Sequence, residues 1–177
     1  MRPPRCARTC WHLIGLTGLG LLLLLGTACA GVGSIRGQAL DAQTKQPIPG
    51  AIVLGVWTQQ EGMVFHITKL VDVKEVEVDA QGRFTLDRPL GFGIEESITV
   101  YKFGYVAWNN ELIFPSYENR KSKSIPDLIL LQPFPAEESH QKHRGFIESV
   151  IRGGMYSNER DQRFEDAIRG REPLKST

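Results

Sequence analysis

The chain has 177 residues, of which 41% are hydrophobic and 23% charged, so the length suits one domain with appendages and wholesale disorder is excluded. Three of its 21 Lys and Arg residues (Arg2, Arg5 and Arg8) precede an N-terminal apolar run, which leaves 18 against 20 acidic residues and excludes a nucleic-acid-binding class. All three cysteines lie within the first 29 residues, so a disulfide-stapled core is excluded as well.

The N-terminus predicts export. A basic segment at residues 1–12 precedes the apolar run Leu13–Leu25, whose 13 residues fit a signal peptide and fall short of the roughly 17–25 that a membrane-spanning helix needs. The L-G-T-A-C sequence that ends at Cys29 resembles the bacterial lipoprotein box, although Gly26 stands where that family usually has leucine. Lipidation also explains the unpaired Cys29, because a free thiol is a liability in an oxidising compartment. Two alternatives stay open: ordinary cleavage after Ala30, and an uncleaved membrane helix.

Residues 34–40 and 51–58 predict the first two strands, separated by the turn formers of residues 41–50. The second strand, A-I-V-L-G-V-W-T, is apolar on both sides, so we expect both of its faces to be covered, and residues 59–62 are expected to end it. In the next apolar run, residues 70–78, the valine side chains occupy odd positions before residues 74–75 and even positions after them. This shift in the alternation predicts a β-bulge or two separate strands.

The stretch at residues 76–86, V-E-V-D-A-Q-G-R-F-T-L, organises the middle of the chain. Two short alternating runs flank D-A-Q-G, whose glycine supplies the positive φ that a tight turn needs, so the pattern predicts a β-hairpin. We expect Phe84 and Tyr105 to belong to the core, with Val76 or Val78 opposite them.

Three more strands are predicted at residues 97–102, within residues 106–114, and at residues 127–131. The turn-rich segment 87–96 and the polar, basic segment 115–124 separate them. Seven short runs with turn signals between them predict a β-sandwich.

After the last strand the apolar period becomes helical. The predicted apolar stripes are Phe146, Ile147, Val150 and Ile151 in a first helix, and Phe164, Ala167 and Ile168 in a second. Pro135 marks the expected start of the first helix and residues 153–154, both glycine, its end. Ser157 or Asn158 would cap the second helix, and Gly170 would end it. Because each stripe is too narrow for a core of its own, we expect the first helix to dock on the sandwich; a detachable arm that binds a partner is the alternative.

Several weak motifs occur in an order and spacing that resemble a known family. They are Gly37 followed by Asp41, Thr44 followed by P-I-P-G-A-I-V at residues 47–53, D-A-Q-G-R-F at residues 79–84, and I-T-V at residues 98–100 before Gly104 and Tyr105. The chain from about residue 33 to 133 thus resembles the carboxypeptidase regulatory-like domain, which implies a transthyretin-like (Ig-like) β-sandwich. A longer segment at residues 59–68 and the helices after the sandwich depart from the family. Its members are attached to enzymes, receptors and lipoproteins alike, so the resemblance implies no particular function.

The expected organisation is therefore mainly β. A lipoprotein signal peptide at residues 1–28 and a tether at 29–33 precede a seven-stranded sandwich at 34–133, and a two-helix tail occupies 134–177.

Metal-ligand residue types cluster at one place, the E-x-x-H-x-x-H run of Glu137, His140 and His143. Helical spacing would place the three on one face, but no second cluster supplies a fourth ligand. We therefore expect a solvated helix face and no metal, with a metal-dependent enzyme as the less favoured alternative. The zinc-peptidase ligand pattern, the Tyr-Arg-Gly-Ser signature of hydroxyisourate hydrolases, G-x-S-x-G and a phosphate-binding glycine loop are all missing from the sequence, so we expect no catalytic residues and no cofactor.

Aromatic residues offer a second candidate site. Trp57, Trp108 and Tyr117 would form a ligand face for a glycan if they were exposed in a row. The favoured expectation is that they fill the core, because aromatic side chains dominate core burial.

The sequence therefore predicts a non-catalytic lipoprotein of the bacterial cell envelope. Cys29 would anchor it, with the outer membrane facing the periplasm as the expected address, and the β-sandwich would act as a binding or scaffold module. The expected partners are the membrane and either an envelope protein or a glycan, and no nucleic acid.

Overall fold

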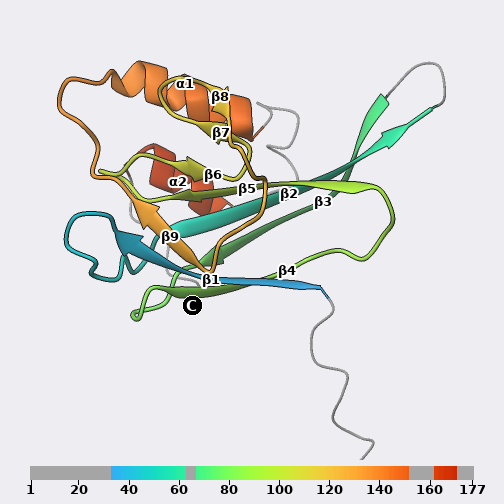
Figure 1. Cartoon of the computed structure of the whole chain (residues 1–177), viewed down its shortest axis with the longest axis horizontal. Coiled ribbons are helices and arrows are strands. Elements are labelled where there is room, and N and C mark those ends of the chain that lie inside the picture. The colour runs from blue at the N-terminus through green and yellow to red at the C-terminus, as the bar shows by residue number, and fades with distance from the viewer. Residues whose placement is uncertain (1–32, 63–66, 152–161, 171–177) are drawn as a thin grey trace, which may run out of the picture. The chain divides into compact units, whose positions relative to one another are not determined.

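The computed structural model describes residues 33–62, 67–151 and 162–170, which form two β-sheets and a helical layer (Figure 1). The first sheet consists of β1 (Ser34–Asp41), β4 (Arg83–Asp87) and β9 (Leu128–Leu131), with β1 in the middle. The second sheet consists of β2 (Ile52–Glu61), β3 (Ile67–Glu77), β5 (Ile94–Tyr101) and β6 (Trp108–Asn109), in the order β3-β2-β5-β6. A small ribbon pairs β7 (Leu112–Ile113) with β8 (Glu118–Asn119), and the helices are α1 (His140–Val150) and α2 (Gln162–Ile168).

The predicted fold class is confirmed: the described chain is mainly β, and its two main sheets hold seven strands that pack as a sandwich. β1 and β9 run parallel, whereas every other described strand pair is antiparallel. None of the helices in the described residues is long and apolar enough to cross a bilayer.

The sandwich core lies between the two sheets. It includes Ile35, Ala39, Val53, Trp57, Val78, Phe84, Leu86, Ile98, Val100, Ile129 and Leu131. The predicted core positions of Phe84 and Val78 are confirmed, whereas Tyr105 is half-buried and packs against the cluster from outside it. The Tyr105 hydroxyl also donates a hydrogen bond to Oδ2 of Asp41 at 2.9 Å, which ties the segment after β5 to the end of β1.

The turn at residues 79–82 corrects the hairpin prediction. β3 and β4 do not pair with each other, because β3 pairs with β2 in one sheet and β4 with β1 in the other. A tight turn does form: Gly82 has φ +80° and its N–H donates to the Asp79 carbonyl at 2.9 Å. Beyond the turn the strands diverge, so that Val78 and Phe84 enter the same core from opposite layers. The alternating pattern therefore marks an arch between two sheets.

The prediction of a bulge or a strand break at residues 74–75 is wrong, because β3 is one continuous strand whose register with β2 is regular there. A bulge lies elsewhere in β3. The β2–β3 register shifts by one at Val71, which has no partner in β2. This shift lets Leu70 and Val73 both pack on the helical side of the sheet. The shift in the alternation at residues 74–75 has another cause, since Val73 faces the helices whereas Val76 faces the sandwich core.

The outer face of β2 is covered by the helices, as the sequence requires. This second core includes Ile52, Leu54, Val56, Phe146, Ile147, Val150, Ile151, Phe164 and Ala167. Alternate residues of β2 thus serve the two cores, and the docking of the first helix through its apolar stripe is confirmed. The second helix packs on the same layer, and the backbone N–H of Phe164 donates to Oε2 of Glu75 at 3.3 Å. Figure 1 shows α1 and α2 on the opposite side of the β3-β2-β5-β6 sheet from β1 and β9.

Several element boundaries differ from the sequence prediction. α1 begins at His140 with Ser139 as its cap, whose Oγ accepts from the Lys142 N–H at 3.3 Å, and not at Pro135. Gly170 ends α2 with φ +69°, as predicted. The expected signals at residues 153–154 and 157–158 lie outside the described residues.

Strand lengths also depart from the pattern. β2 continues to Glu61 because its polar end pairs with the start of β3, and β5 begins three residues early, at Ile94, opposite Gln59. The predicted strand within residues 106–114 is two short strands, β6 and β7. β8 lies in the segment that was predicted as a loop, because it pairs with β7.

Candidate functional site

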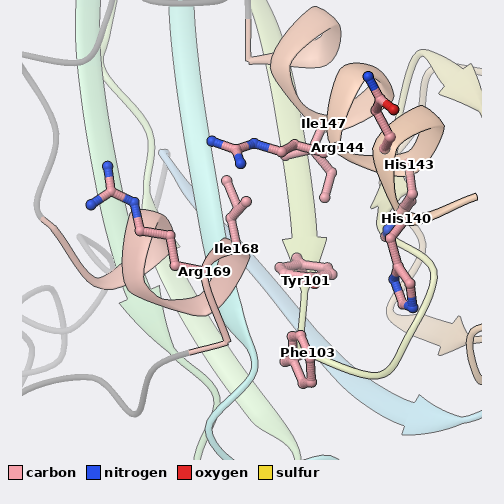
Figure 2. Close-up of a pocket in the computed structure, with 9 residues that line it drawn as sticks. Tyr101, Phe103, His140, His143, Arg144, Ile147, Ile168 and Arg169 are labelled. Carbon is pink, nitrogen blue, oxygen red and sulfur yellow. The ribbon is translucent and has the colours of Figure 1, made fainter.

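A groove of about 660 Å³ lies between α1 and α2, beside the end of β5. Its lining residues are Tyr101, Phe103, His140, Gln141, His143, Arg144, Ile147, Ile168 and Arg169. Figure 2 shows Arg144 reaching from α1 toward α2, with Tyr101 and Phe103 below α1 and to one side of α2. The groove therefore combines apolar side chains from the sheet and both helices with cationic side chains from each helical segment.

The floor of the groove is apolar. Tyr101 is the last residue of β5 and is buried, and its ring lies 6.4 Å from that of Phe164. Burial raises the pKa of Tyr101 to about 12, so the phenol stays neutral. Phe103, in contrast, is 59% exposed. It rests against Gly170, where an added Cβ would lie 2.9 Å from the Phe103 ring. The floor thus presents an exposed ring beside a buried one.

The rim carries positive charge. Arg144 is exposed, and its Nε lies 3.1 Å from Oε1 of Glu148 one turn later on α1. Such an exposed i,i+4 pair is worth little, so Arg144 remains available to another anion. Arg169 follows the last residue of α2 and is exposed. A ligand with a carboxylate beside an apolar group would match this arrangement.

His143 closes one side of the groove and is held firmly. It is 4% exposed, and its Nε2 accepts a hydrogen bond from the backbone N–H of Ala107 at 2.9 Å. The rings of Phe114 and Phe134 lie 4.8 and 5.0 Å away. Burial, with a smaller contribution from the neighbouring charge of His140, lowers the pKa of His143 to about 4. His143 is therefore a neutral side chain that fastens α1 to the segment before β6.

The Glu137, His140 and His143 run does not form a metal site. Among the described residues, no three His, Cys, Asp or Glu side chains lie close enough together to hold a metal ion. His140 stacks on Phe134 at 4.4 Å, while His143 turns into the core. The expectation of a solvated helix face is corrected for His143, because the helix rotates this position against the sheet. Glu137 precedes α1 and is exposed.

The three aromatic candidates are not brought together. Trp57 is completely buried in the sandwich core, which agrees with the favoured expectation and rules out the alternative that it lies on an exposed ligand face. Trp108 is partly buried against the same core, with the guanidinium of Arg120 at 5.1 Å from its ring. Tyr117 packs on the other layer, where its ring lies 5.4 Å from that of Phe146. Cys29 lies outside the described residues, so its lipidation stays a prediction.

Sequence reasoning missed the groove because its residues come from separate segments. Tyr101 ends a strand, Phe103 follows it, and Arg144 and Arg169 belong to helices whose relative placement no local pattern encodes. A usable signal was the arginine-rich second helix, with cationic residues beside a narrow apolar stripe.

Neither a protein-family model nor a curated protein matches the chain. Among solved structures, the chain is similar to one described as "Structure of the Streptococcal ancillary pilin", with 16% identity and a TM-score of 0.31. The similarity covers 58% of this chain and 30% of that chain, so the chain spans less than a third of the length of this neighbour. A likeness of this size carries no inference. The class of the protein, a β-sandwich with a helical layer, follows from its own strand order.

Proposed function

We propose that the protein is a non-catalytic lipoprotein of the bacterial cell envelope that binds another envelope protein through the groove between α1 and α2. In this proposal a lipid on Cys29 holds the protein at the outer membrane, facing the periplasm. The sandwich, similar in its motifs to the carboxypeptidase regulatory-like domain, serves as the scaffold that positions the groove.

The observation that carries the binding role is the make-up of the groove. Phe103 offers an exposed aromatic surface at its floor, and Arg144 and Arg169 offer charge on either side. A peptide segment that carries an acidic residue next to an apolar one would place its carboxylate on the guanidinium groups and its apolar side chain on the ring. We therefore assign the partner as a protein with such a segment.

The titratable groups near the groove support binding over acid–base catalysis. The Nε2 of His143 already accepts the Ala107 N–H, and His140 stacks on Phe134. A general base needs a free nitrogen within reach of a substrate proton, and the described geometry commits His143 to the backbone. The glycan alternative receives less support, because Trp57, Trp108 and Tyr117 do not form one surface.

The anchor is tested by replacing its cysteine. Cys29→Ala should release the protein into a soluble fraction or leave the precursor uncleaved, because two or more acyl chains are needed for stable anchoring. Cys10→Ala is the matched control, since this cysteine lies in the predicted signal peptide, and it should leave the protein in the membrane fraction. Mass spectrometry of the wild-type protein should find a lipid on an N-terminal Cys29. An unmodified N-terminus at Gly31 would contradict the anchor.

The groove is tested by photo-crosslinking in intact cells. A photoreactive residue at Phe103 should capture a partner, whereas one at the exposed Thr85 of β4, in the other sheet, should not capture the same protein. Charge reversal at both rim positions, Arg144→Glu with Arg169→Glu, should abolish the Phe103 adduct while the protein remains folded. If the adduct survives this reversal, the groove is not the binding surface.

A further inference from the structure

The loop between β4 and β5 displays two large apolar side chains that nothing in the described chain covers. Phe92 is 97% exposed and Leu90 is 79% exposed. Single exposed apolar residues are ordinary on protein surfaces and need no explanation. Two of them within three positions of one short loop, both almost fully in water, form a protruding apolar tip.

The tip is held in place by the surrounding strands. The side-chain Nε2 of Gln59 donates to the Phe92 carbonyl at 3.0 Å, and Nε of Arg88 lies 2.8 Å from Oε2 of Glu96. The backbone N–H of Arg88 also donates to the carbonyl of Gly33. Because the loop backbone is tied at both ends, Phe92 and Leu90 project from a fixed position.

The tip lies where the N-terminal segment joins the sandwich. Gly33 immediately precedes β1, and an added Cβ there would lie 3.5 Å from Cδ2 of Leu90. Ile67 lies at the same end of the sandwich and is 67% exposed. It pairs with Glu61 of β2, and Gln59, two residues earlier in β2, pairs with Ile94 at the start of β5. Figure 1 shows the β4–β5 connection, the start of β1 and the free end of the β2–β3 ribbon at one end of the sandwich.

The length of chain between Gly33 and Cys29 limits how far this end can lie from a lipid anchor. Four peptide units join the two residues, so they span at most about 14 Å when fully extended. A lipid attached to Cys29 would therefore keep the Leu90 and Phe92 tip close to the bilayer surface. At that distance, burial of the two side chains among lipid headgroups and acyl chains removes their apolar surface from water.

We propose that the β4–β5 loop inserts Leu90 and Phe92 into the bilayer surface beside the lipid anchor and so fixes the orientation of the sandwich on the membrane. This inference rests on the proposed lipidation of Cys29. The occupant of the apolar tip is a lipid surface, because the tether brings lipid to this end of the molecule. Full insertion of one such side chain favours the bound orientation by about tenfold or more.

The experiment uses the lipidated protein in vesicles of phosphatidylethanolamine and phosphatidylglycerol. Phe92→Cys introduces a thiol into a mature chain whose only other cysteine, Cys29, is blocked by lipid, so an environment-sensitive fluorophore can be attached there alone. Thr85→Cys, also exposed and on the outer face of β4, is the matched control. Brominated lipids should quench the label at position 92 and leave the label at position 85 largely unquenched, because quenching requires contact with the acyl chains.

Two results would overturn the insertion. The first is equal quenching at positions 92 and 85, and the second is a label at 92 that is shielded from water yet not quenched by lipid, which would place protein on the tip. A loss of quenching in a Leu90→Ser background would support it, because the neighbouring apolar contact with lipid is removed. Flotation with the vesicles and the mass of lipidated Cys29 are measured on the same sample, so failure of the anchor is distinguished from failure of the loop.

Discussion

Acidification should weaken the attachment of α1 to the sheet through one buried imidazole. His143 is neutral in the folded protein because burial lowers its pKa to about 4, whereas an unfolded histidine has a pKa of about 6.5. Protonation would convert Nε2 from an acceptor into a donor and leave the Ala107 N–H without its partner. Tyr101 and His140 are the titratable neighbours, and a neutral Tyr101 ring lies 5.7 Å away.

The sign and size of the effect follow from the two pKa values. At pH values between these two pKa values the unfolded chain binds the proton and the folded chain does not, so the free energy of unfolding falls as the pH drops from about 6.5 toward 4. Below about pH 4 both states bind the proton, and His143 causes no further loss. A difference of about 2.5 pKa units corresponds to a loss of roughly 3 kcal/mol in the free energy of unfolding. Such a loss is a large part of the stability of a small domain without disulfides.

Urea unfolding from about pH 7.5 down to about pH 4, compared between wild type and His143→Gln, isolates this group. Glutamine keeps an acceptor for the Ala107 N–H but does not titrate. Backbone hydrogen bonds lower the pKa values of Asp41 and Asp79, so protonation of these carboxyl groups also destabilises the protein. This contribution is the same in the wild type and in the variant. The wild type should therefore lose roughly 3 kcal/mol more than the variant over this range. Parallel pH profiles would refute the reasoning.

Four further substitutions test the packing and are measured by urea or thermal unfolding. Gly55→Ala should destabilise the protein by roughly 1–3 kcal/mol, because the added Cβ would lie 2.4 Å from the Trp57 ring. Gly145→Ala, inside α1, meets nothing closer than 4.0 Å and should stabilise the protein by about 0.5–1 kcal/mol. Phe84→Ala should cost roughly 3–5 kcal/mol, since it empties the sandwich core, and an unchanged melting temperature would contradict its buried position. Phe164→Ala should cost a similar amount, and a loss below about 0.5 kcal/mol would show that α2 contributes nothing to the helical core.

The sequence predicted which residues are buried better than it predicted which strands pair. The alternation on either side of residues 79–82 correctly placed Val78 and Phe84 in the core. Alternation reports only which way a side chain points, however, and a hairpin and an arch between two sheets satisfy it equally well. The choice depends on the distant partners β1 and β2, and no local pattern names them.

The same limit applies to two of the candidate site residues. Trp57 stands in a strand that is apolar on both faces, so the sequence required burial but did not say which core would take the ring; Gly55 leaves the space that it fills. His143 is three positions before Phe146 on α1 and so shares its face, and the residue that holds it, Ala107, is 36 positions away. Polar residues on an apolar helix face are thus informative only once the facing backbone is known.

The two proposed surfaces lie at opposite ends of one strand, which gives the proposals a common geometry. β5 begins at Ile94, directly after the loop that carries Phe92, and ends at Tyr101, on the floor of the groove. Eight residues of strand span about 25 Å, so a sandwich that rests on the bilayer through its β4–β5 loop would hold the groove about that far from the lipid surface. At this height the groove would face the aqueous compartment rather than the headgroups. A short tether and a fixed apolar tip would together orient the groove toward a protein partner, which a long flexible linker would not do.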